Sequence, residues 1–318
     1  MSNIQSSVVI LNYNGKEYLR NCLRSVLAAD VQDSEVIVVD NASTDGSARM
    51  VAAEFPLVRL IRSERNLGFA GGNNLGISES LGRYIILLNG DTIVSRGWLN
   101  HLVDTAAANE KVGIVGSKLL FPNGRINSTG LLFGCRLCNA LDRGAGEIDY
   151  GQYDEKRNVL GVCFACTLVK RDVIRDVGLL DEKYFLYVED LDYCLRTRLR
   201  GYEVVYCPDS IVQHIVGASL RRPVVAQRHA LKNRLRTLLK NYGAINVLRW
   251  GAYSLVFYLL LAPLSCIRKF HFQMAIVHLY ALFWNLLNLP IRERLEIQRK
   301  RCVGDNALFS YSVRTRWS

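Results

Sequence analysis

Asp91 and His214 are the side chains whose surroundings most favour metal chemistry. Asp91 follows the apolar run IILL and the turn-forming pair Asn89-Gly90, in the stretch IILLNGDT at residues 85–92. A carboxylate is a hard oxygen ligand of the kind that Mg²⁺ and Mn²⁺ prefer. His214 ends a later apolar segment, where it is either a core histidine or a second ligand beside Asp91. A single Asp after a strand is often only a turn residue, so a metal site here is a hypothesis.

Asp190 is the side chain best suited to acid–base chemistry. It lies in the stretch VEDLDYCLR, near the start of a helix that we expect from about residue 190 to residue 200. Acidic residues in a first helical turn commonly just offset the helix dipole. The alternative is that Asp190 faces a cleft and takes a proton from a hydroxyl group as a general base. The residues alone leave both interpretations open.

Asp40 and the glycine-rich stretch RNLGFAGGNN indicate a place for a nucleotide. Asp40 lies at the tip of the apolar segment EVIVVD, where a carboxylate can accept hydrogen bonds from a nucleobase or from ribose hydroxyls. Asp45, close by, has a competing role as a helix cap. Three glycines between residues 68 and 72 allow the backbone to approach a phosphate or a sugar, although their spacing matches neither the P-loop nor the Rossmann pattern.

The elements that must position these residues alternate between strands and helices. Apolar strand-like segments at 8–11, 35–40, 58–61 and 84–88 alternate with helical patterns such as 16–29 and 47–54. This alternation predicts an α/β fold with a mostly parallel central sheet flanked by helices. Because parallel strands end at one edge of a sheet, we expect their polar tips to line one cleft. These tips are Asn12, Asp40, Asn66 and Asp91.

The composition is that of a folded protein with an anionic partner. The chain has 318 residues, of which 50% are hydrophobic, and a formal net charge of +11. Basic proteins favour nucleic acid, anionic lipid or phosphorylated substrates. Nine cysteines, with no signal-peptide pattern before the first apolar segment, favour a reducing, cytoplasmic setting.

Two CxxC pairs, Cys135/Cys138 and Cys163/Cys166, raise the question of a zinc site. Paired CxxC motifs can bind zinc. However, GVCFACTLV has the pattern of a buried strand, in which Cys acts as a small apolar residue, and the 24 intervening residues exceed the spacing of a typical zinc ribbon. Core cysteines are therefore the favoured interpretation.

Five segments in order resemble a family 2 glycosyltransferase with the GT-A fold. They are SVVILNYNG, VIVVDNASTDGS, RNLGFAGGNNLGI, ILLNGDT, and the stretch that runs from GVCFACTLV through VEDLDYCLR to VQHIVGAS, and they lie within residues 7–219. The most similar subgroup is rhamnosyltransferase-like and elongates cell-surface polysaccharides. The resemblance implies an inverting transfer of a sugar, with rhamnose as the candidate. The donor would be a UDP- or dTDP-linked sugar, and the acceptor a hydroxyl on a lipid-linked or cell-surface glycan.

The same resemblance assigns roles to individual residues. It implies that Asp190 is the catalytic base and that Asp91 and His214 are on the metal side of the site, holding Mg²⁺ or Mn²⁺. Asn89 stands where this family's metal motif often has its first Asp, which weakens metal affinity, and Gly90 replaces a common proline. The positions that the resemblance places against the nucleotide-sugar are Asn12, Asp40, Asn66, Gly68, Asn73 and Asn89.

The last third of the chain has a different character and predicts membrane association. A basic stretch at 221–240 precedes two charge-free stretches, 18 residues at 250–267 and 22 at 270–291. Each approaches the length that spans a bilayer, but Pro263 interrupts the first and polar residues dilute the second. We therefore expect residues 1–222 to form the GT-A domain and residues 223–318 a basic and apolar helical region. That region would lie on the cytoplasmic face of the membrane against anionic lipid; spanning is not excluded.

Three other functions compete with the sugar transferase. A non-catalytic nucleotide-sugar or glycan-binding protein of the same fold would not need both Asp91 and Asp190. A nucleic-acid binder would explain the charge, but the basic segment lacks interleaved aromatic residues and adjoins an apolar one. A nucleotidyltransferase would share the cleft but has no use for the Asp190 helix. We expect a nucleotide-sugar donor and no nucleic acid.

Overall fold

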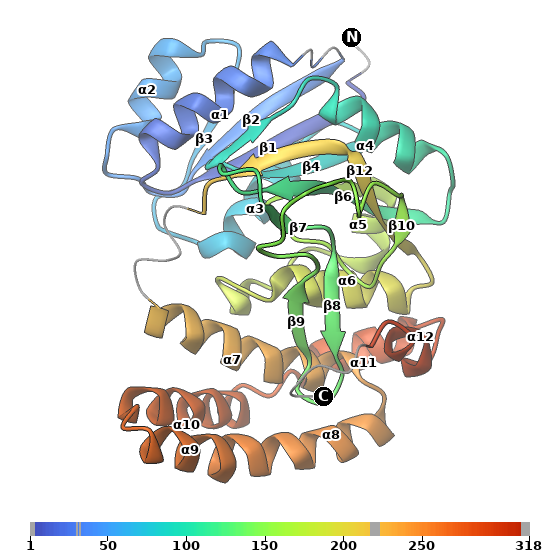
Figure 1. The fold of residues 1–318 in the computed structure, drawn as a ribbon. Helices are drawn as coiled ribbons and strands as arrows, with labels where there is room; N and C mark the ends of the chain where they lie inside the picture. The colour runs from blue at the N-terminus through green and yellow to red at the C-terminus, as the bar shows by residue number, and fades with distance from the viewer. Residues whose placement is uncertain (1–3, 30, 32, 217–222, 313–318) are drawn as a thin grey trace.

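A ten-stranded sheet forms the centre of the protein (Figure 1). The computed structural model describes residues 4–29, 31, 33–216 and 223–312. The first four strands run parallel in the order β4-β1-β2-β3. They are β1 (Ser6–Asn12), β2 (Ser34–Asp40), β3 (Arg59–Arg62) and β4 (Tyr84–Asn89).

The second half of the sheet contains a short strand that runs against both of its neighbours and a long strand at its far side. Strand β11 (Cys166–Lys170) lies antiparallel between β4 and β6 (Val112–Leu120), and β12 (Glu203–His214) runs parallel to β6. The prediction of a mostly parallel α/β sheet is confirmed. A bulge between Cys207 and Ile211 lets β12 continue as one strand to His214. The remaining short strands are β5 (Thr92–Val94), β7 (Ile126–Ser128), β8 (Leu131–Gly134), β9 (Asn139–Asp142) and β10 (Arg157–Asn158).

Helices cover both faces of the sheet because its strands are apolar on both faces. Along β1, Val8 and Ile10 pack into one core cluster while Val9 packs into the other. The first cluster lies under α1 (Lys16–Ala28), α2 (Ser47–Glu54) and α4 (Trp98–Ala107). The second lies under α3 (Gly68–Glu79), α5 (Arg171–Val177) and α6 (Glu189–Leu199).

The C-terminal helices form two further layers below α6 (Figure 1). α7 (Pro223–Asn241) packs on α6, and α10 (Phe272–Leu287) packs on the other side of α7. α8 (Ala244–Val256) and α9 (Ala262–Arg268) lie with α10 in the layer farthest from the sheet. Two shorter helices, α11 (Ile291–Lys300) and α12 (Asp305–Phe309), complete the region. The expected boundary at residue 222 lies outside the described residues.

Pro263 does not interrupt the first apolar stretch. A continuous helix of 25 residues extends from Ala244 to Arg268. A π-helical turn at Phe257–Leu261 comes just before the proline, and the wider turn accommodates the ring that would clash in a regular ladder. The expectation of a break at this proline is therefore wrong.

Gly76 allows α3 to lie close against β1 and β2. A β-carbon at this position would stand 2.3 Å from Val9 Cγ1 and 3.1 Å from Val39 Cγ2. Both valines are fully buried and, as β-branched residues, cannot turn away easily. The close approach sets the distance between α3 and the sheet. The first residue of α3, Gly68, belongs to the glycine-rich loop.

We predict that Gly76→Ala destabilises the protein by up to about 2 kcal/mol. Overpacking costs about 1–3 kcal/mol, of which the better helix propensity of Ala returns roughly 1 kcal/mol. Urea unfolding followed by circular dichroism measures the change. Gly304→Ala is the control, because a β-carbon there meets no atom within 4 Å. Equal stability of the two variants would contradict the close packing.

Candidate active site at the carboxyl edge of the sheet

The carboxyl ends of β1, β2 and β4 bring three predicted site residues together. In the strand registers Asn12 is opposite Asp40, and Leu11 is opposite Asn89. The Asn12 amide nitrogen is 3.5 Å from Asp40 Oδ1 and donates to Ser43 Oγ at 3.1 Å. Asn12 and Asp40 are both buried at the bottom of this edge. The expected convergence of distant strand tips is therefore present.

Asn41 organises the glycine-rich loop, and sequence reasoning missed it. Its amide nitrogen donates to Asn66 Oδ1 at 3.0 Å and to the Gly68 carbonyl at 3.1 Å. Its own Oδ1 accepts from the Leu67 amide at 2.8 Å. Asn66 Oδ1 also accepts from the Gly68 amide at 2.8 Å. The signal available in the sequence was only that Asn41 follows the strand-tip residue Asp40.

Gly68 connects this loop to the segment that precedes α6. Its φ is +71°, and a β-carbon would stand 2.3 Å from the Phe185 carbonyl oxygen. The amide of Phe69 donates to the same oxygen at 2.5 Å. Asn73, by contrast, is buried within α3, where its side-chain nitrogen Nδ2 donates to the Phe69 carbonyl at 2.9 Å. Gly68 therefore lies at a junction between two loops, while Asn73 supports the first turn of its own helix.

Asp91 and His214 face one another across the same edge. His214 Nε2 is 3.4 Å from Asp91 Oδ1 and 3.4 Å from the Asn89 amide nitrogen. His214 lies opposite Thr92 in the pairing of β12 with β5, which brings it to the turn that carries Asp91. Its Nδ1 is 3.0 Å from Asn127 Oδ1. An amide oxygen accepts, so the proton of a neutral ring is at Nδ1, and Nε2 keeps its lone pair toward Asp91.

The pair Asp91 and His214 suits a divalent cation that takes its other ligands from the enzyme's substrate. Among the described residues, no group of three or more His, Cys, Asp or Glu side chains is arranged to hold a metal ion. One carboxylate and one imidazole nitrogen leave most coordination positions for other oxygen atoms. Mg²⁺ and Mn²⁺ sites with one or two protein carboxylates commonly take the rest of their ligands from substrate phosphates and water. The donor set therefore suits a cation that bridges protein and diphosphate.

Asp190 lies in the first turn of α6, beside two other acids. Its Oδ1 accepts from the Leu191 amide at 2.7 Å. Burial and the nearby Asp142 carboxylate raise the pKa of Asp190 to about 6, against the backbone N–H groups that favour the charged form. Burial and the Asp190 charge also raise the pKa of Glu189 well above its ordinary value. A carboxyl with a pKa near 6 can accept a proton at neutral pH.

Asp142 links the two halves of the site and was not predicted. It ends β9, in the β8–β9 hairpin. Burial raises the pKa of Asp142, while the Ser128 hydroxyl and the charge of His214 act in the opposite direction. Asp142 therefore lies near both His214 and Asp190. The pattern around Asp142, a short polar hairpin, carried no signal for this position.

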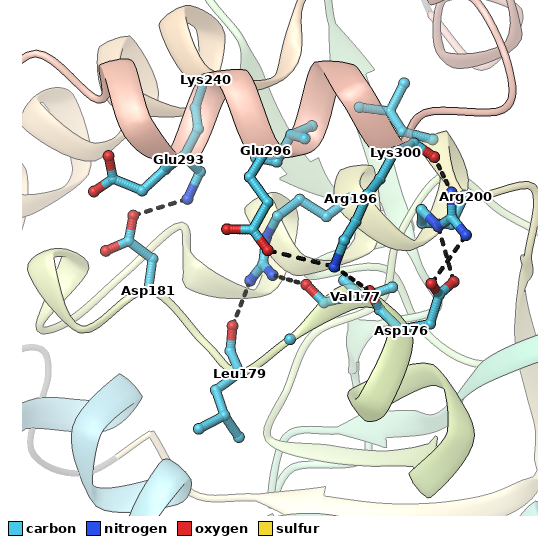
Figure 2. Close-up of a pocket in the computed structure, with 13 residues that line it drawn as sticks. Asp176, Val177, Leu179, Asp181, Arg196, Arg200, Lys240, Glu293, Glu296 and Lys300 are labelled. Carbon is cyan, nitrogen blue, oxygen red and sulfur yellow. Dashed lines mark hydrogen bonds and ion pairs between the residues drawn. The ribbon is translucent and has the colours of Figure 1, made fainter.

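A cavity of about 250 Å³ between α6, α7 and α11 contains none of the predicted site residues (Figure 2). The charges that line it pair with one another: Arg200 with Asp176, Lys240 with Asp181, and Lys300 with Glu296. Arg196 donates to the carbonyls of Val177 and Leu179. The cavity therefore lies at the interface between the sheet domain and the C-terminal helices, where the charged side chains pair with one another.

The cysteines of the two CxxC pairs are free thiols. Cys138 and Cys166 are buried, and burial raises the pKa of Cys166 to about 12. Ser117 Oγ donates to Cys166 Sγ at 3.1 Å. These two thiols are thus part of the apolar core.

A mostly parallel sheet with polar side chains at its carboxyl edge is the arrangement in which α/β enzymes bind their ligands. Residues 7–178 match the model of glycosyl transferase family 2, so the chain belongs to that family. In structure, the chain is similar to GalNAc-T7 with UDP, GalNAc and Mn²⁺ bound. The TM-score is 0.69 at 15% identity, over 96% of this chain and 56% of that one. The predicted GT-A fold is confirmed.

Two curated proteins are similar in sequence to about two thirds of this chain. The chain is 27% identical over 235 residues to an N-acetylglucosaminyl-diphospho-decaprenol L-rhamnosyltransferase of Mycobacterium tuberculosis, covering 65% of this chain and 75% of that protein. It is 27% identical over 230 residues to the O-antigen biosynthesis protein RfbC of Myxococcus xanthus. That match covers 70% of this chain but only 18% of the much longer relative.

We predict that transferase activity rises as the pH increases through about 6, because Asp190 must lose its proton to act as a base. The groups that face it are Glu189, Asp142, Cys163 and the amides of Leu191 and Phe164. Asp142→Asn removes a negative neighbour, so the rise should move to lower pH. The pH profile of kcat/KM measures both effects. Asp172→Asn, at an exposed position on α5, is the control and should leave the profile unchanged. An Asp142→Asn profile that superimposes on the parent's would contradict this electrostatic link.

Proposed function

We propose that this family 2 enzyme inverts the sugar's anomeric centre in a single displacement, with Asp190 as the base. The supporting observations are the position of Asp190 in the first turn of α6 and the contact of Asp91 with His214 at the strand edge. A base on one side of the cleft and a cation site on the other is the arrangement that direct attack on C1 requires. No covalent enzyme intermediate is needed, so no nucleophilic side chain is assigned.

Each side chain has a distinct task in this proposal. Asp91 and His214 would hold a divalent cation, which would supply positive charge beside the departing nucleoside diphosphate. Asp190 accepts the proton of the acceptor hydroxyl as its oxygen bonds to C1 and the bond from C1 to the diphosphate breaks. The residues proposed to contact the nucleotide-sugar are Asn12, Asp40, Asn66, Gly68, Asn73 and Asn89. Of these, Asn12, Asp40 and Asn89 share the strand edge with Asp91.

Rhamnose is the proposed sugar, and a UDP- or dTDP-linked rhamnose the proposed donor. The relative from Mycobacterium tuberculosis carries L-rhamnosyltransferase in its name, and its name also specifies a diphospho-decaprenol acceptor. A lipid-linked or cell-surface glycan is accordingly the proposed acceptor class. The exposed apolar face described below supports a membrane-bound acceptor.

The test of this function is a panel of nucleotide-sugars assayed with Mn²⁺ or Mg²⁺, with Asp190→Asn alongside the parent. We expect the parent to release nucleotide from a deoxythymidine- or uridine-linked donor. Asp190→Asn should bind that donor with similar affinity and lose turnover by a factor of about 100 or more, because a general base contributes about 10²–10⁴-fold. Isothermal titration with the nucleoside diphosphate and Mn²⁺ measures the binding. Near-parent turnover in the variant would remove Asp190 from the role of base.

A membrane-facing surface on the outermost layer of helices is the second part of the proposal. The 25-residue helix 244–268 has a mean hydropathy of 1.6 over its most apolar window, of which only 22% is buried. A core helix of a soluble protein would be mostly covered. The large exposed apolar residues of this layer include Leu248, Leu255, Leu260, Leu264, Phe272, Ile276, Phe283 and Leu287. We propose that this layer contacts lipid.

Charges beside the apolar face favour an anionic, cytoplasmic leaflet. Arg249 precedes the charge-free stretch, and Arg268 and Lys269 follow it. Basic residues next to an apolar helix are attracted to negatively charged headgroups. The proposed organisation is a GT-A domain at residues 1–222 and a membrane-associated region at 223–318. Monotopic or peripheral attachment agrees best with the packing of α10 against α7.

We predict that the double variant Leu260→Asp/Phe283→Asp binds phosphatidylglycerol-containing vesicles at least about tenfold more weakly. Each aspartate costs roughly 2–3 kcal/mol in the apolar part of a bilayer. The two residues are 50% and 53% exposed, so the fold should tolerate the change. Co-sedimentation with vesicles measures binding. The control is Leu57→Asp/Leu81→Asp, at positions that are 89% and 67% exposed next to β3 and α3. Parent-like sedimentation of the first variant would count against the lipid-facing layer.

A further inference from the structure

A single row of side chains on α7 contacts both the loop before α6 and α6 itself. The row has a spacing of four residues, so its members lie on one face of the helix. His229 stacks on Phe185, with ring centroids 5.5 Å apart. Thr237 Oγ1 is 2.6 Å from the Tyr184 hydroxyl. The members of this row are His229, Asn233, Thr237 and Asn241.

Asn233 makes the central contact of the row. Its side-chain nitrogen donates to three carbonyls of the loop, those of Tyr184 at 3.0 Å, Leu186 at 2.9 Å and Tyr187 at 2.7 Å. The residue is fully buried. Carbonyls that turn inward in a loop need a donor, since buried polar groups without partners are costly. The two N–H groups of one side chain therefore serve three carbonyls of this loop, one of them through a shared hydrogen.

The loop needs such a support because its backbone is strained. Phe185, Tyr187 and Val188 have φ values of +63°, +68° and +71°. Left-handed backbone is unfavourable for residues with a β-carbon, and most of all for a β-branched one such as Val188. Conformations of this kind cost about 1–3 kcal/mol per residue and persist only where surrounding contacts enforce them. The contacts from α7 supply that enforcement.

The loop in turn sets the position of two parts of the proposed active site. Toward the donor side, the Phe185 carbonyl accepts from the Phe69 amide and touches Gly68. Toward the acceptor side, Val188 is the residue that immediately precedes α6, whose second residue is Asp190. A shift of the loop would therefore move the glycine-rich loop and the base together.

We propose that Asn233 is a positioning residue of the transferase, which acts by holding the loop 184–188 and thereby aligning Asp190 with the donor site. The inference rests on the proposed role of Asp190. It makes α7 part of the catalytic apparatus as well as the connection to the proposed membrane layer. Asn233 touches no reacting atom in this account.

The structure provides a matched control at Asn285 on α10. This asparagine is also buried, and its side-chain nitrogen donates to two carbonyls, Lys232 at 2.9 Å and Ala281 at 2.8 Å. Neither acceptor belongs to the loop 184–188. Asn285→Ala removes a comparable buried donor in the same helical region, so it reports what such a loss does to stability alone.

The experiment compares Asn233→Ala with Asn285→Ala in the full chain in detergent. Hydrogen–deuterium exchange of peptides covering residues 183–192 should accelerate in Asn233→Ala and stay at the parent rate in Asn285→Ala. With the donor found active in the nucleotide-sugar panel, kcat of Asn233→Ala should fall roughly 10- to 100-fold, the size expected when a catalytic group is displaced by about 1 Å. The donor KM should also rise, since the glycine-rich loop moves. Asn285→Ala should keep kcat within about twofold.

Two outcomes would overturn the proposal. One is parent-like kcat and exchange in Asn233→Ala, and the other is an equal loss of kcat in both variants. If Asn233→Ala fails to fold, Thr237→Val removes the hydrogen bonds of Thr237 Oγ1 to the Tyr184 hydroxyl and to the Asn233 carbonyl, and it should still accelerate exchange in residues 183–192. An unchanged rate there would also overturn the proposal. Asp190→Asn is assayed in parallel. Retained turnover in that variant contradicts the proposed function, whereas the exchange comparison tests the role of Asn233 separately.

Discussion

The burial of one carboxylate, Asp192, is the interaction on which the arrangement of α6, the helix of the proposed base, depends. Asp192 is 1% exposed and receives Lys240 Nζ at 2.9 Å, Arg196 Nε at 3.0 Å and the Asn241 amide at 2.7 Å. Burial alone would raise the pKa of Asp192, but the charges of Lys240 and Arg196 hold it below its ordinary value. A buried ion that lost these partners would destabilise the protein strongly. These contacts hold α6 against α7, and Asp190 lies two residues before Asp192 in the first turn of α6.

The sequence predicted the strand tips well because their pattern is local. An apolar run followed by polar turn residues is recognisable without knowing the fold, and parallel topology then brings Asn12, Asp40 and Asn89 together. The contact between Asp91 and His214 could be predicted for the same reason, because Asp91 follows an apolar run and His214 ends one. Element boundaries agreed to within about a residue at α2 and α6.

The remaining parts of the site depend on contacts between distant segments. Asn41, Asp142 and Asn233 are ordinary polar residues in sequence, and their roles follow from which loop or charge they meet in space. The bulge in β12 and the π-helical turn before Pro263 were likewise not predicted from the sequence. The sequence predicted only membrane association for residues 223–318. The structure adds that α7 has buried contacts on both sides, with α6 and with α10.

The central claim is that a nucleoside diphosphate and its cation bind between Asp91, His214 and the strand tips, with Asp190 facing the acceptor. A crystal structure of the full chain with Mn²⁺ and uridine or deoxythymidine diphosphate, recorded at the manganese absorption edge, tests this most directly. The account predicts an anomalous peak within coordination distance of Asp91 and His214, with the nucleobase beside Asn12 and Asp40. A manganese peak elsewhere, or nucleotide density in the charged cavity between α6 and α11, would contradict it.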